Sequence, residues 1–91
     1  MLPLVWTDDA TFDLLAILDH IGARDVAAAD RLNDLIQRAA GRLPRHPYMH
    51  RRGRLAGTRE AIVHPNYLVI YRVGREAVEI LAVVHARRRY P

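Results

Sequence analysis

The chain has 91 residues, of which 51% are hydrophobic, and it contains no cysteine. A chain of this length forms one domain with a thin core. Its high content of apolar residues excludes a chain that is disordered throughout. Without cysteine there are no disulfides and no thiolate metal sites. No apolar run approaches the length of a membrane span. We therefore expect a single domain over residues 1–91 that is soluble and cytoplasmic, with no membrane contact.

The charge is divided between the two parts of the chain. Residues 1–40 hold seven aspartates and three arginines, a net charge of −4. Residues 41–91 hold eleven arginines and three glutamates, a net charge of +8. All the basic residues are arginine, whose guanidinium suits carboxylates, phosphates and stacked rings better than an ammonium does. A genome rich in G and C also favours arginine codons. The pattern predicts an acidic surface and a separate basic one.

The first 44 residues predict a strand and a helical hairpin. Residues 2–6 are apolar with a β-branched centre, and Thr7 or Asp8 can cap the helix that follows. Apolar residues then recur at helical spacing as far as Gly22, where this helix should end. Asp25 caps a second helix, which ends at Pro44. The apolar face of the second helix consists of Ala28, Leu32, Leu35, Ile36, Ala39 and Leu43.

After an irregular segment over residues 45–53, three strands follow: 58–64, 67–73 and 77–84. The tight turn at Pro65-Asn66 uses the fixed φ of proline and the tolerance of asparagine for a left-handed conformation. The element order is then β-α-α-β-β-β, an α+β fold in which the helical hairpin covers one face of a small, mainly antiparallel sheet. Alternation places Val78, Ile80, Ala82 and Val84 on one face of the last strand, and Ala77, Glu79, Leu81, Val83 and His85 on the other.

Both faces of these strands carry apolar residues, but a helical hairpin covers only one. The second face should be apolar and aromatic and rimmed by arginine, which is typical of a binding surface.

His85 is the main candidate for chemistry because it precedes a run of arginines and a tyrosine at the end of the chain. Such a histidine can transfer protons while arginines hold a phosphate and the tyrosine stacks on a base. The alternative is a hydrogen-bonded histidine at a strand end, with the arginines solvated or contacting an acidic partner. The residues after it in this C-terminal strip are Arg87, Arg88, Arg89 and Tyr90.

Other candidates are weaker. His46 and His50 are four residues apart, but they flank a proline and have no cysteine or nearby carboxylate, so we expect no metal and no cofactor. Tyr67 and Tyr71 share one face of a strand, where packing is favoured over base stacking. The sequence has no paired carboxylates, phosphate loop or nucleophile elbow, so an enzyme is not favoured.

Seven segments spread along the chain form a recognisable set: residues 1–6, 28–32, 46–48, 57–60, 64–67, 70–73 and 84–91. In this order they resemble the RelE/ParE toxin superfamily over essentially the whole chain, and the ParE branch most closely. The resemblance implies a toxin of a type II toxin–antitoxin system, which a cognate antitoxin holds inactive. ParE toxins act by binding DNA gyrase and blocking replication, whereas RelE relatives cut mRNA in the ribosome.

The resemblance favours gyrase binding over RNA cleavage. RelE relatives often have an arginine where this chain has Leu68 and a lysine where it has Ala61, and neither of these apolar side chains can hold a phosphate. The alternative is a ribosome-dependent mRNA endonuclease that uses His85 and the C-terminal arginines. A third possibility is a plain nucleic-acid-binding module, which would bind DNA in a strongly salt-dependent way.

These interpretations assign two surfaces. We expect the target to contact His85, Arg87, Arg88, Arg89 and Tyr90, with Arg59, Tyr67 and Tyr71 as a second group. We expect the antitoxin to cover Arg59, Tyr67, Leu68, Tyr71 and Leu81.

Overall fold

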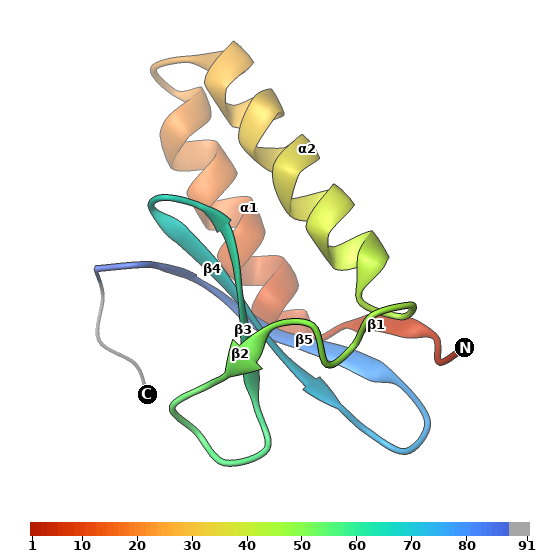
Figure 1. The fold of residues 1–91 in the computed structure, drawn as a ribbon. Coiled ribbons are helices and arrows are strands. Elements are labelled where there is room, and N and C mark those ends of the chain that lie inside the picture. Colours follow the sequence, from red (N-terminus) through yellow and green to blue (C-terminus); the bar gives the residue numbers. More distant parts are fainter. Residues whose placement is uncertain (88–91) are drawn as a thin grey trace.

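The computed structural model describes residues 1–87. Two antiparallel helices lie side by side on one face of a five-stranded sheet, whose strand order is β1-β5-β4-β3-β2 (Figure 1). Strand β1 runs parallel to β5, and all other neighbours are antiparallel. No helix in this part of the chain is long and apolar enough to cross a membrane. The elements are β1 (Leu4–Trp6), α1 (Asp8–Gly22), α2 (Val26–Arg42), β2 (Arg51–Arg52), β3 (Arg59–His64), β4 (Tyr67–Val73) and β5 (Val78–His85).

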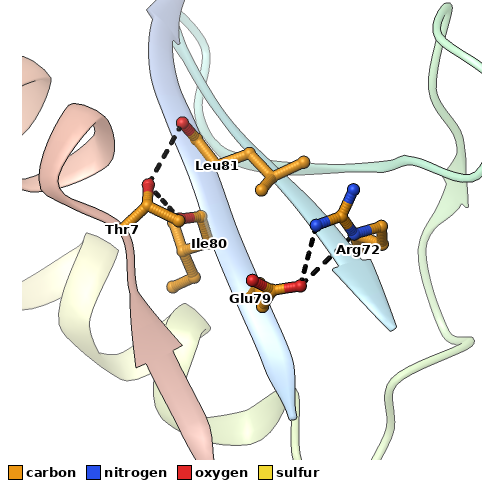
Figure 2. Close-up of polar contacts among 5 residues, drawn as sticks. All are labelled: Thr7, Arg72, Glu79, Ile80 and Leu81. Carbon is orange, nitrogen blue, oxygen red and sulfur yellow. Dashed lines mark hydrogen bonds and ion pairs between the residues drawn. The ribbon is translucent and has the colours of Figure 1, made fainter. Parts of the chain in front are cut away.

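Both predicted helix caps are present. The Thr7 side chain accepts a hydrogen bond from the Ala10 amide at 3.2 Å, and the Asp25 side chain accepts one from Ala28 at 3.0 Å. The Thr7 hydroxyl also donates to the carbonyl of Ile80 at 2.8 Å (Figure 2). Thr7 therefore starts α1 and fixes it to the middle of β5.

The core lies between the helical hairpin and the sheet. Its helix side includes Leu14, Leu32 and Ile36, and its sheet side is centred on Tyr71 and Ile80. Leu35, which the helical periodicity placed on the buried face of α2, is 43% exposed instead, because it lies at the margin of that face.

The α+β prediction is confirmed, and the structure adds one short strand and one pairing direction at the edges of the sheet. Strand β2 has only two residues and lies in the segment that the sequence predicted to be irregular. Strand β1 makes the sheet mixed, because it pairs with β5 in parallel. The Pro65-Asn66 turn is present, but no non-glycine residue in the described part of the chain has a positive φ, so Asn66 does not use the expected left-handed conformation.

The expected faces of β5 are wrong beyond Ile80. Ile80 pairs with Tyr71 and Ala82 pairs with Ile70, so Leu81 is an extra residue that forms a bulge. A bulge of one residue exchanges the two faces for the rest of a strand. Val83 and His85 therefore lie on the helix side with Ile80, whereas Ala82 and Val84 lie on the opposite side.

Candidate functional site

The face of the sheet opposite the helices has an apolar centre. Leu68 and Ile70 on the central strand are nearly buried, whereas Ile62 on β3 is 58% exposed. In Figure 2 the Leu81 side chain extends away from Thr7 and over the neighbouring strand. We call this surface the open sheet face; its apolar members are Ile62, Leu68, Ile70, Leu81, Ala82 and Val84.

Ion pairs lie at the margins of the open sheet face. Arg72 donates to the Glu79 carboxylate at 2.9 Å from Nη2 and at 3.3 Å from Nε (Figure 2). Arg51 donates from Nε to Glu60 Oε1 at 2.8 Å. Glu60 is nearly buried, and its second oxygen has no hydrogen-bond partner among residues 1–87. These two arginines are compensated by glutamates, so they add little free positive charge to this face.

A second surface lies between α1 and the end of β5. It is an open groove with a volume of about 900 Å³. On the β5 side the Asp13 carboxylate accepts a hydrogen bond from the Val83 amide at 3.1 Å. Strand β1 pairs with β5 only as far as Ile80, so Asp13 supplies the hydrogen-bond acceptor that this amide would otherwise lack. The lining residues are Phe12, Asp13, Ala16, Ile17 and His20 from α1, with Tyr67, Val83, Val84, His85 and Arg87 from the sheet and its end.

Two histidines and a tyrosine gather at the β5 end of this groove. The ring of Tyr67 contacts those of His85 and His64, with centroids 5.2 and 5.8 Å apart. Nδ1 of His85 accepts from the Arg87 amide at 3.2 Å, and Nδ1 of His64 accepts from the Asn66 amide at 3.0 Å. A neutral imidazole that accepts at Nδ1 carries its proton at Nε2. Each ring, when neutral, can therefore donate a hydrogen bond from Nε2.

The predicted partner residues do not form one surface. Leu68 and Leu81 lie on the open sheet face, whereas Arg59, Tyr67 and Tyr71 belong to the helix side. Tyr67 lies with His85 and Arg87 beside the groove. Arg88, Arg89 and Tyr90 of the predicted C-terminal strip lie outside the described residues.

Tyr71 and Arg59 hold the segment that follows α2. Tyr71 is fully buried, and its hydroxyl donates to the carbonyl of Pro47 at 2.7 Å. Burial raises the pKa of Tyr71, and the nearby charge of Arg59 opposes this shift. Arg59 donates to the carbonyl of His50 at 2.8 Å and lies over the ring of Tyr48. Both side chains support the structure from inside the helix side of the sheet.

His46 and His50, which the sequence does not favour as metal ligands, lie in the segment that follows α2. No group of three or more potential ligands gathers anywhere within residues 1–87. His50 packs edge-on against Tyr71, with ring centroids 6.0 Å apart. Partial burial and then the charge of Arg42 lower the pKa of His50, which favours the neutral ring.

Sequence reasoning missed the α1 side of the groove. Phe12, Ala16 and His20 are spaced by four residues and lie off the apolar stripe that packs on the sheet. Phe12 is 75% exposed. The sequence signal for this side of the groove was Phe12, a large aromatic residue outside the buried stripe of an amphipathic helix.

Comparisons with known proteins agree with this fold. Residues 4–90 match the family model described as the ParE toxin of the type II toxin–antitoxin system. The chain is 40% identical to Toxin RelE2 of Caulobacter vibrioides, over 97% of this chain and 99% of that protein. It is 38% identical to the putative toxin Y4kP of Sinorhizobium fredii, over 89% and 88% of the two chains.

A solved structure shares the architecture. The chain superposes on a structure described as the chromosomal ParDE system of P. aeruginosa with a TM-score of 0.84, covering 93% of this chain and 96% of that one. The identity of 24% makes this a likeness of fold. The length of the family match and the curated relatives lead to one conclusion: the chain belongs to the ParE toxin family of type II toxin–antitoxin systems.

Proposed function

We propose that this toxin arrests growth by binding DNA gyrase and blocking replication, and that a cognate antitoxin neutralises it. Family membership implies the antitoxin partner. The observation that carries the choice of target is the apolar character of two positions where RNA-cleaving relatives often place basic residues. Ala61 is 1% exposed and packs toward the helices, and Leu68 is 6% exposed. Neither position can hold a phosphate.

The open sheet face supports inhibition by binding. Its centre is apolar, and Arg51 and Arg72 at its margins are paired with Glu60 and Glu79. Such a surface suits a protein partner with apolar side chains and a few complementary charges. We propose that the antitoxin covers this face, including Leu68 and Leu81, and extends toward Arg59 and Tyr67.

The proposed target contact is the end of β5 and the residues after it. His85 and Arg87 line the same groove as Phe12, whose side chain is exposed. Arginine and aromatic residues are enriched in protein–protein contacts, so Arg87 and Phe12 in one groove support a contact of this kind. The full strip consists of His85, Arg87, Arg88, Arg89 and Tyr90.

A ribosome-dependent endonuclease is the second candidate, favoured by the grouping of His64, Tyr67 and His85. Histidines next to an arginine are side chains that acid–base chemistry on a phosphodiester uses: a ring that carries both protons can give one to the leaving oxygen, and a ring with a free nitrogen can accept one. In this mechanism His85 transfers the proton, and Arg87 with the following arginines stabilises the phosphate.

The two candidates are distinguished with purified components. Gyrase, supercoiled DNA and ATP are mixed with the toxin, and trapped cleavage complexes are measured; in parallel, mRNA cleavage is measured on programmed ribosomes. We expect cleavage complexes and no mRNA cleavage. We expect changing Arg87, Arg88 and Arg89 together to alanine to abolish trapping while the fold is retained. The matched control changes Arg24, Arg31 and Arg38, all exposed on the helical side, to alanine, and should trap normally.

His85→Ala gives the sharpest separation. The gyrase mechanism predicts only a partial loss of killing, because His85 is one contact among several. The nuclease mechanism predicts complete loss of killing, because the proton-transfer group is removed. mRNA cleavage by the wild-type chain that His85→Ala abolishes would replace the gyrase proposal with the nuclease one.

A further inference from the structure

The short ladder between β2 and β3 contains two cross-strand pairs of opposite character. On the open sheet face Arg51 is opposite Glu60 and pairs with its carboxylate. On the other face Arg52 is directly opposite Arg59. Like charges directly opposite each other on antiparallel strands are destabilising. The same two-residue strand therefore carries one compensated pair and one uncompensated pair.

The charges of Arg52 and Arg59 are not neutralised by carboxylates. Arg59 donates from Nη1 to the carbonyls of His50 and Tyr48, at 2.8 and 3.4 Å, and its guanidinium lies 5.0 Å from the centre of the Tyr48 ring. These contacts fix its position but supply no full negative charge. Within residues 1–87, neither guanidinium has an acidic group within salt-bridge distance.

The two arginines line a hollow with a volume of about 410 Å³. Its floor is the loop over residues 53–57, which is closed by a hydrogen bond from the Gly53 amide to the Thr58 carbonyl at 2.8 Å. A Cβ at Gly53 would collide with the Thr58 hydroxyl, and Gly57 has a φ of +79°. Glycine is thus favoured at both ends of this loop, at Gly53 by the close Thr58 side chain and at Gly57 by its positive φ.

The chain segment that contains the hollow carries a strong positive charge. Residues 42–59 contain six arginines and two histidines and no acidic residue. Burial is the main cause of the lowered pKa of His50, and the positive charge of Arg42 lowers it further. Beside the hollow, Tyr48 is 66% exposed, so one side of its ring is available while Arg59 lies over the other.

We propose that the hollow between Tyr48, Arg52 and Arg59 binds a phosphate group of a nucleic-acid backbone. A phosphate placed between the two guanidinium forks relieves their mutual repulsion and accepts charge-assisted hydrogen bonds from both. The exposed Tyr48 ring can stack on a base or sugar of the same strand. A long polyanion matches the extended basic segment better than a single carboxylate or free phosphate does. This inference goes beyond gyrase binding and does not depend on it.

The test uses the isolated chain and fluorescently labelled single-stranded DNA and RNA 20-mers of the same sequence. Affinity is measured by anisotropy over a series of salt concentrations for the wild type, Arg52→Ala and Arg38→Ala. Arg38 is an exposed arginine on α2, so its variant matches the charge change. We expect Arg52→Ala to weaken binding about five-fold or more and to lower the slope of log affinity against log salt by about 0.7, the value for one phosphate contact on a single strand. Arg38→Ala should stay within about two-fold of the wild type.

A stability measurement separates binding from a structural role. Because Arg52→Ala removes a like-charge pair, we expect its melting temperature to equal or exceed that of the wild type. Binding of either DNA or RNA with this dependence on Arg52 supports the proposal and identifies which strand is preferred. No binding of either strand, equal losses in both variants, or displacement of the strand by poly-glutamate would overturn it.

Discussion

Tyr71 joins the sheet to a segment that lies 24 residues earlier in the chain. Its ring is fully buried against the helices, and its hydroxyl reaches the Pro47 carbonyl. Arg59, its cross-strand partner, bonds to carbonyls of the same segment. The alternation of residues 67–73 predicts that Tyr71 shares a face with Tyr67, but the Pro47 contact could not be predicted, because it depends on the path of an irregular loop.

We expect Tyr71→Phe to lower the free energy of unfolding by about 1 kcal/mol, because the Pro47 carbonyl loses its hydrogen bond while the ring still fills its place. The measurement is urea unfolding at neutral pH. Tyr67→Phe is the matched control, since Tyr67 is linked to its neighbours through ring contacts with His64 and His85. Equal stability of Tyr71→Phe and the wild type would contradict the role given to this hydroxyl.

At the scale of the element, the bulge in β5 decides which residues reach the groove. Without Leu81 as an extra residue, Val83 and His85 would lie on the open sheet face. Hydrophobic alternation predicts that β5 exists and where it ends. It does not reveal the bulge, because both faces of the strand carry apolar residues whether or not Leu81 is an extra residue. For this reason the sequence predicted His85 as a site residue but not its place beside Tyr67 and α1.

Asp13 secures the part of β5 that β1 does not reach. We expect Asp13→Ala to lower the free energy of unfolding by about 1–2 kcal/mol, because the Val83 amide loses its acceptor. Hydrogen exchange at that amide should accelerate. Asp19→Ala removes an exposed carboxylate from the same helix and should leave Val83 exchange unchanged. Slow exchange at Val83 in the Asp13 variant would show that another group protects the strand edge.

At the scale of the molecule, the charge is divided as the elements are. The aspartates belong mostly to the helical hairpin, and the arginines belong mostly to the sheet and the segments that flank it (Figure 1). Opposite charge on two sides of a small domain steers partners toward different faces and makes association rates depend on ionic strength. The sequence predicted this division directly, because the strand and helix boundaries coincide with the change in sign near residue 40.

The central claim is that the toxin acts on gyrase, and pulse-labelling of DNA and protein synthesis tests it most directly. The chain is induced without an antitoxin, and incorporation is followed through the first minutes, with the triple alanine variant of Arg87, Arg88 and Arg89 as the inactive control. We predict that DNA synthesis falls first and that a DNA-damage response follows. If protein synthesis falls first while the DNA stays intact, the ribosome is the target and His85 is its catalytic residue.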